Sequence, residues 1–254
     1  MKLNAIRHAG PEGVPLLIAH GLFGSARNWG GVAKRLSEGR EVVAVDMRNH
    51  GASPWDAEHS YAAMAADLDE AVEALGGRAD VLGHSMGGKA AMVLALTRPE
   101  AVRRLVVADI APVAYGHTQA GLVEAMRRLD LSGVTRRGEA DRRLAAAVED
   151  RGVRAFLLQS LAIEADGARW ALNLETLGAR MPAIMGFPEV EGRFEGPVLV
   201  LRGGASDYVG DDRLPAFRGL FPDVRGETLE GAGHWLHAEQ PDAFAEAVSR
   251  FLSE

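Results

Sequence analysis

Short apolar runs recur along this chain, and longer segments of mixed character separate them. The runs are continuous rather than alternating, which is typical of parallel strands buried on both faces of a sheet. On this pattern we predict strands at residues 15–19, 41–45, 79–82, 105–108 and 197–201, and a further strand near residues 227–229.

The segments between these runs have helical periodicity. Ser60 suits the N-cap of a helix that Gly76 would end, and two more helices are predicted at residues 86–97 and 242–252. Alternation of strands and helices implies a mostly parallel sheet with helices on both sides. The sequence therefore predicts an α/β fold.

The alternation stops between residues 113 and 195. This stretch has no convincing strand pattern and is rich in Ala, Leu and Arg at helical spacing. We predict roughly three or four helices here, inserted between two strands. The core would then comprise residues 1–112 and 196–254, and residues 113–195 would form a helical lid.

Composition narrows the class of protein. In a chain of 254 residues, 47% are hydrophobic, so one large domain with a substantial core is available. The net charge of −7 argues against a nucleic-acid or anionic-membrane partner, because both attract basic surfaces. With no cysteine there is no disulfide and no thiolate metal site. No signal peptide or membrane span is visible, so we expect a cytoplasmic protein.

The most informative motif lies where the third predicted strand meets the second predicted helix. Residues 83–87 form the pattern G-x-S-x-G around Ser85. This pattern is typical of a nucleophile elbow, a sharp turn that exposes a serine hydroxyl to substrate. Glycines beside such a turn allow the strand and the helix to approach closely. We therefore predict Ser85 as a nucleophile.

Other candidate residues also follow predicted strands. The carboxyl ends of parallel strands meet at one edge of the sheet, so these loops should converge on Ser85. His234, after the last predicted strand, has the chemistry to take the serine proton near neutral pH. The backbone amides of Leu22 and Met86 could stabilise an oxyanion. Among the other histidines, we expect a structural role for His20, His50 and His84. A surface position is expected for His8, His59 and His117. His237 should lie either at the surface or in a supporting position near the site.

Two aspartates could complete a triad with Ser85 and His234. Asp109 ends the strand at residues 105–108, and Asp207 lies in the loop after the strand at residues 197–201. Both precede His234 in the chain and fit the order serine, acid, histidine. We interpret a third carboxylate, Asp46, as ordering the turn that follows it.

Several motifs together resemble the α/β-hydrolase superfamily, and more closely the YbfF-type small bacterial esterases. They are H-G-L-F-G-S at residues 20–25, D-M-R-N-H-G at 46–51, G-H-S-M-G-G-K-A at 83–90, D-I-A-P-V at 109–113 and G-A-G-H-W-L-H-A-E at 231–239. The resemblance implies an α/β-hydrolase fold with an inserted helical lid. It also implies that the acid is Asp109, in the D-I-A-P motif, with Asp207 as the alternative. Ser206 occupies the slot where most of the superfamily has its acid, and we expect it to assist His234.

These residues predict a serine hydrolase that cleaves small acyl esters or thioesters through an acyl-enzyme, as a monomer or small homo-oligomer. No metal or cofactor is expected, and the predicted partner is a small-molecule substrate. Phe23 and apolar lid residues, above all Trp170 and Met181, are candidates to bind substrate; the other lid candidates are Phe156, Leu158, Leu174, Leu177 and Met185. A cofactor-free lyase or carbon–carbon hydrolase on the same triad, or a non-catalytic binding protein, are the alternatives. Ser85 argues against a dehalogenase, which needs a carboxylate nucleophile.

Overall fold

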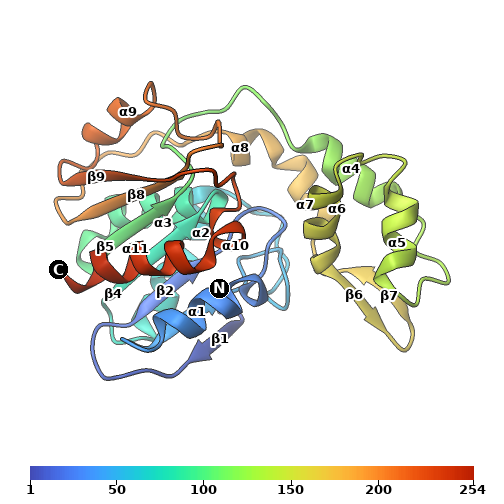
Figure 1. Cartoon of the computed structure of the whole chain (residues 1–254), viewed down its shortest axis with the longest axis horizontal. Helices are drawn as coiled ribbons and strands as arrows, with labels where there is room; N and C mark the ends of the chain where they lie inside the picture. Colours follow the sequence, from blue (N-terminus) through green and yellow to red (C-terminus); the bar gives the residue numbers. More distant parts are fainter.

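A seven-stranded sheet forms the centre of the computed structural model, which describes residues 1–254. The strand order is β1-β3-β2-β4-β5-β8-β9, and every neighbouring pair is parallel except β1 with β3 (Figure 1). The strands are β1 (Ala5–His8), β2 (Leu16–Ala19), β3 (Val42–Val45), β4 (Ala79–His84), β5 (Val102–Ala108), β8 (Val198–Gly203) and β9 (Val224–Leu229). The predicted α/β class and all six predicted strands are confirmed.

The edge strand β1 was not predicted. It pairs antiparallel with β3, and Ala5 lies opposite Val45. Its four residues alternate between exposed and half-buried positions, so it has no continuous apolar run. An edge strand needs less apolar surface than a central one, which explains why a search for buried strands missed it.

The central strands are buried on both faces, and alternate side chains enter two different cores. Leu17 of β2 contacts the larger core beneath α2 and α3, whereas its neighbour Leu16 enters the smaller core under α1 and α11. The helices of the core are α1 (Gly30–Leu36), α2 (Tyr61–Glu73), α3 (Met86–Thr97), α9 (Leu214–Arg218), α10 (Leu236–Glu239) and α11 (Pro241–Ser253), with short 3₁₀ turns η1 (Ala26–Trp29) and η2 (Pro99–Ala101). Burial on both faces accounts for the continuous apolar runs.

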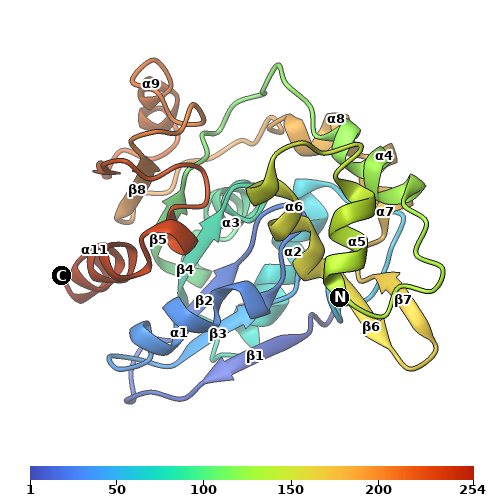
Figure 2. The same ribbon diagram turned by 45° about the vertical axis from the view of Figure 1, so that its right-hand side comes forward.

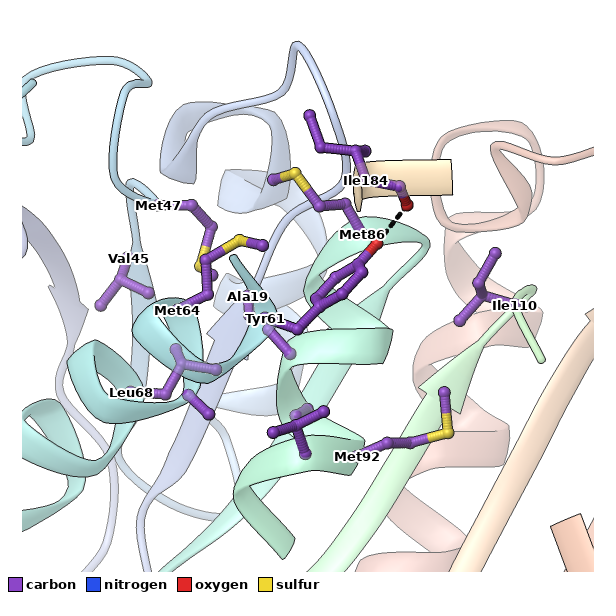
Figure 3. Close-up of a cluster of buried hydrophobic side chains, with 14 of the residues drawn as sticks. Ala19, Val45, Met47, Tyr61, Met64, Leu68, Met86, Met92, Ile110 and Ile184 are labelled. Atoms are coloured by element: carbon purple, nitrogen blue, oxygen red, sulfur yellow. Dashed lines mark hydrogen bonds between the residues drawn. The ribbon is translucent and has the colours of Figure 1, made fainter. Parts of the chain in front are cut away.

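The three predicted core helices are present as α2, α3 and α11. Ser60 caps α2 as expected, because its hydroxyl accepts a hydrogen bond from the Ala63 amide at 3.2 Å. Figure 3 shows Met64 and Leu68 of α2, and Met92 on the opposite side of α3, among the buried apolar side chains of the larger core. Helix α1 was not predicted.

The chain leaves the sheet after β5 and returns at β8, and residues 113–195 between them are called the insert below. The insert contains α4 (Ala120–Arg128), α5 (Arg137–Leu144), α6 (Arg151–Leu157), η3 (Leu158–Ser160), β6 (Leu161–Glu164), β7 (Gly167–Trp170), α7 (Leu174–Ala179) and α8 (Met181–Met185). Figures 1 and 2 show most of it to one side of the sheet, with α8 reaching back over the core. The predicted boundaries of the insert stay a prediction.

The prediction that the insert has no strand was wrong, because β6 and β7 form an antiparallel hairpin. Only one residue of each strand is buried, so neither has the buried apolar run that identifies the predicted strands of the sheet. Gly167, with φ +136°, takes a conformation that suits glycine as the chain enters β7. None of the helices in the structure combines the length and the apolar character that crossing a membrane requires.

Candidate active site

Ser85 lies on a sharp turn between β4 and α3. Its backbone has φ 51° and ψ −118°, a combination that L-residues rarely adopt. The flanking glycines make room for this turn: a Cβ atom on Gly83 would lie 2.3 Å from the Gly87 carbonyl oxygen, and one on Gly87 would lie 2.4 Å from the Ala19 oxygen. The G-x-S-x-G pattern is therefore a steric requirement of the fold at this point.

Three residues from three loops form a hydrogen-bonded chain. Nε2 of His234 lies 3.1 Å from Oγ of Ser85, and Nδ1 of His234 lies 2.8 Å from Oδ2 of Asp109. With Nδ1 protonated, the imidazole donates to the carboxylate and accepts from the serine hydroxyl. The structure thus brings together the predicted nucleophile, base and acid at the carboxyl ends of β4, β5 and β9.

Asp109 is fully buried, and the loop after β8 holds its carboxylate. The Gly203 amide donates to Oδ1 at 3.0 Å, and the Ser206 hydroxyl donates to Oδ2. Ser206 therefore contacts Asp109 rather than His234, with which we had expected it to interact. The alternative acid, Asp207, is exposed and does not contact His234. The loop after β8 supports the carboxylate from β5.

Leu22 and Met86 both line a cavity that adjoins Ser85, and the Leu22 amide makes no hydrogen bond within the protein. The Met86 amide is free because it opens helix α3. The residue after Leu22, Phe23, has φ 65°, which is uncommon for a residue with a side chain. Two unpaired amides next to a serine hydroxyl are the arrangement that an oxyanion requires.

Aromatic packing holds the His234 imidazole. The Tyr208 ring stacks on it with 3.8 Å between centroids and 18° between planes. The ring of Tyr115 packs against Tyr208, and its hydroxyl donates to the Tyr208 carbonyl at 2.7 Å. On the other side, Nε2 of His84 lies 2.8 Å from the His234 carbonyl oxygen. Tyr208 was not predicted from the sequence, where its only signal is its place beside Asp207 in the loop after β8.

A cavity of about 200 Å³ adjoins Ser85. Thirteen of its 19 lining residues are hydrophobic, and they come from both the core and the insert. Phe23 is among them, as are Phe156 and Met185 of the insert. Trp170 and Met181 are not: the Trp170 indole donates to the Met126 carbonyl inside the insert at 2.9 Å, and Met181 borders a separate depression. The remaining lid candidates, Leu158, Leu174 and Leu177, also lie away from the cavity.

Lys89 is buried at the wall of this cavity, a position that the sequence did not predict. Its ammonium donates to the carbonyls of Met185 at 3.0 Å and Gly186 at 2.5 Å. The ring centroids of Tyr115 and Tyr61 lie 4.7 and 5.7 Å from Nζ. Burial lowers the pKa of Lys89 from 10.5 to about 7. Lys89 therefore links α3 to the end of α8 in the insert.

Several histidines are more buried than we predicted. His59, expected at the surface, is fully buried, and burial lowers its pKa to about 4. His237 is also buried and stacks on Trp29 at 4.2 Å, with its pKa lowered to about 3 by the same cause. His117 is exposed, as expected. No group of three or more His, Asp or Glu side chains is arranged as a metal site would be.

The remaining structural expectations hold. His20 bonds the loop backbone, with Nδ1 2.8 Å from the Gly21 oxygen and Nε2 accepting from the Met47 amide at 2.9 Å. Asp46 orders its turn by accepting from the amides of Ala26 at 2.7 Å and Ala52 at 2.9 Å. These contacts connect the loop after β2 to the turn after β3.

Comparisons with known proteins agree with this geometry. The chain is 41% identical over 247 residues to the sn-1-specific diacylglycerol lipase ABHD11 of Mus musculus, covering 94% of this chain and 80% of that protein. It is 37% identical over 244 residues to esterase YbfF of Escherichia coli (strain K12), covering 94% and 93%. A solved structure of a marine microorganism esterase superposes with a TM-score of 0.93 at 36% identity, covering 98% of this chain and 99% of that one. The model of the alpha/beta hydrolase fold family matches residues 14–241, and the chain belongs to that family.

Proposed function

We propose that the protein is a serine-dependent carboxylesterase that hydrolyses small acyl esters or thioesters through an acyl-enzyme. The observation that carries the proposal is the chain from Ser85 through His234 to Asp109, placed beside two unpaired amides at the wall of an apolar cavity. The relatives described above are a lipase and esterases, which supports a hydrolase.

The first half-reaction forms the acyl-enzyme. His234 takes the proton of Ser85 as Oγ attacks the acyl carbon. The amides of Leu22 and Met86 then stabilise the negative charge that develops on the carbonyl oxygen. Asp109 fixes the imidazole tautomer and stabilises its protonated form. The protonated His234 gives its proton to the departing alcohol or thiol.

The second half-reaction releases the acid. His234 takes a proton from water, the resulting hydroxide attacks the acyl carbon, and the tetrahedral intermediate again places its charge on the two amides. Collapse of this intermediate breaks the bond to Ser85 Oγ, which recovers its proton from His234. The substrate and this water are the only reactants that the two steps consume.

The cavity supports the choice of an acyl substrate. Its walls are mainly apolar, with Leu122, Val153 and Phe156 contributed by the insert. Such a surface favours a hydrocarbon chain next to the reacting carbonyl, because apolar area leaves water. We propose that the insert acts as a lid over Ser85, and that its lining residues set the acyl length.

Initial rates on p-nitrophenyl esters from acetate to palmitate, with acyl-CoA thioesters alongside, test the proposal. We expect saturable turnover, a burst of p-nitrophenol, and labelling of Ser85 by a fluorophosphonate. Ser85→Ala should abolish both turnover and labelling. Ligand-induced stabilisation without any turnover would instead indicate a binding protein. Cleavage of a carbon–carbon bond in the absence of ester cleavage would indicate a lyase or carbon–carbon hydrolase.

A further inference from the structure

Both peptide groups of Phe23 are hydrogen-bonded, one by a residue of the core and the other by a residue of the insert. The Phe23 amide donates to Nε2 of His50 at 3.2 Å. The Phe23 carbonyl accepts from the Ser160 hydroxyl at 2.6 Å. His50 belongs to the core, whereas Ser160 belongs to the insert. Because the amide of Phe23 shares a peptide group with the Leu22 carbonyl, these contacts fix the backbone directly after the proposed oxyanion donor.

His50 is arranged as a hydrogen-bond acceptor for this amide. It is fully buried, and Nδ1 lies 2.9 Å from the Arg48 carbonyl oxygen. A proton on Nδ1 satisfies that carbonyl and leaves Nε2 with a free lone pair toward Phe23. Burial and the neighbouring histidines lower the pKa of His50 well below 6.5, which favours this neutral form.

Ser160 lies on a seam where the insert is joined to the core. The Gly51 amide donates to the Ala171 carbonyl at 2.8 Å, and the Asn173 amide donates to the Asn49 carbonyl at 3.0 Å. The Asn173 side chain adds a bond to Oδ1 of Asn49 at 3.0 Å. The seam, defined by these bonds and by Ser160 with Phe23, flanks His50 on both sides in the sequence. It fastens the insert to the turn that carries His50.

Phe23 needs these partners because its φ of 65° is disfavoured for a residue with a Cβ atom. Without them its backbone would relax toward a more common conformation. The adjacent Leu22 peptide would turn with it, and the Leu22 amide would leave the position that an oxyanion donor must occupy.

We propose that His50 and Ser160 are positioning residues for the Leu22 amide, so that the insert completes the oxyanion site as well as covering it. This inference rests on the proposed function, since it assigns a catalytic purpose to the Leu22 amide. It assigns no contact between substrate and either His50 or Ser160.

Kinetics of Ser160→Ala and of His50→Leu, which has no hydrogen-bond acceptor, test the proposal, with p-nitrophenyl butyrate as substrate and a trifluoromethyl ketone as inhibitor. The inhibitor forms a hemiketal on Ser85 whose oxyanion occupies the same site as that of the intermediate. Loss of a whole oxyanion donor costs ~10²–10³ in rate, so a displaced donor should lower kcat about 10- to 100-fold. We expect KM to change less than about twofold and the inhibition constant to rise by the factor by which kcat/KM falls.

Two further variants separate positioning from simple damage. Ser160→Thr keeps the hydroxyl and should retain most of the activity. Ser132→Ala removes an exposed serine elsewhere in the insert and should match the wild type. Unchanged kcat and inhibition constant in both Ser160→Ala and His50→Leu would overturn the proposal, as would a rise in KM alone.

Hydrogen–deuterium exchange gives a readout that needs no turnover. In Ser160→Ala and His50→Leu, amides of residues 21–26 should exchange at least about tenfold faster than in the wild type, because the opening free energy of this loop falls. Unchanged exchange in both variants would overturn the inference. If the wild type cleaves no ester, the proposed function fails, and the exchange result still decides whether these two residues hold the loop.

Discussion

Ser85 and Asp109 share an uncommon backbone geometry, with φ of 51° and 49°. Each comes directly after a buried central strand, and each turns sharply out of the sheet to meet His234. Such conformations cost about 1–3 kcal/mol and persist only where the surroundings enforce them. Here the enforcing contacts are visible: the Ser85 amide donates to Ala108 O at 3.0 Å, and the Asp109 amide to Leu201 O at 2.9 Å. Adjacent strands therefore hold the two turns in place.

The choice between the two acids can be tested directly. We predict that Asp109→Asn lowers kcat by about 10³–10⁴-fold, because the amide no longer fixes the productive imidazole tautomer or balances its charge. Asp207→Asn should change kcat less than about twofold, since the Asp207 side chain is exposed and makes no contact with His234. Steady-state rates on one p-nitrophenyl ester suffice, and the reverse ranking would transfer the acid role to Asp207.

The stacked ring of Tyr208 gives a second prediction for a single residue. Stacking of this kind is worth about 0.5–1.5 kcal/mol, so Tyr208→Leu should lower kcat by about 2- to 10-fold as His234 gains freedom. Tyr208→Phe keeps the ring and should stay close to the wild type. Equal losses in the two variants would indicate that the hydroxyl matters, through its contacts with His117 and Gln119.

At the scale of the elements, the sequence predicted those whose pattern follows from burial on two faces or on one helix stripe. It did not predict β1 or the β6–β7 hairpin, in which no strand has more than one buried residue. Strands β6 and β7 pair only with each other, whereas β1 depends on a partner that is distant in the sequence, because it pairs with β3 across more than thirty residues. The local sequence pattern of a strand cannot indicate a pairing partner that lies so far away in the chain.

The same distinction holds within the candidate site. Ser85, His234 and the two unpaired amides follow from motifs, because strained turns require specific local residues. The contacts of Ser206, Tyr208 and Lys89 depend on how separate loops meet in space. Trp170 and Met181 have apolar character in common with the cavity residues, and only the packing of the insert distinguishes them. Motifs therefore predict the reacting groups, and three-dimensional packing determines their supports.

The fastening of α8 is a property of elements and can be tested through Lys89. Side chains from α2 and α3 capture the last carbonyls of α8: Tyr61 donates to Ile184 O at 2.5 Å (Figure 3), and Lys89 donates to Met185 and Gly186. Because the pKa of Lys89 falls from 10.5 to about 7 on folding, the unfolded chain binds more protons between these pH values. Burial of Lys89 therefore lowers stability most at pH 7 and below, and this cost diminishes as the pH rises toward 10.5.

We predict that the stability of the wild type relative to Lys89→Met rises with pH between 7 and 10. The slope should approach about 1.4 kcal/mol per pH unit, the value for one proton. Urea unfolding at pH 7, 8.5 and 9.5 measures it, with Lys34→Met, which removes an exposed lysine, as the matched control. A stability difference independent of pH would contradict the burial of a cation at this position.

At the scale of the whole molecule, buried histidines make the fold sensitive to acid. Burial lowers the pKa values of His20, His50, His59, His84 and His237. Each group takes up a proton near pH 6.5 in the unfolded chain but only at a lower pH in the folded one. The stability that each contributes is therefore fully present above about pH 6.5 and is lost as the pH falls toward the folded pKa.

His59 allows a quantitative test, because its pKa is lowered to about 4. Its contribution of about 3 kcal/mol should disappear between pH 6.5 and 4. We predict that His59→Gln, whatever its stability at pH 7.5, gains about 2 kcal/mol relative to the wild type when the pH is lowered to 5. Denaturant unfolding at both pH values checks this. Parallel pH curves for the two proteins would show that His59 titrates normally in the folded state.

The seam through Ser160 limits how freely this protein could exchange parts with its relatives. An insert that only covered the cavity could be replaced by another insert of suitable shape, and only the preferred substrate would change. In this protein the insert also holds the loop that carries the Leu22 amide, because the Ser160 hydroxyl donates a hydrogen bond to the Phe23 carbonyl. An insert taken from a relative should therefore preserve turnover only when this hydroxyl and the loop that accepts its hydrogen bond are transferred together. The evolution of substrate choice is thereby coupled to the evolution of catalytic power.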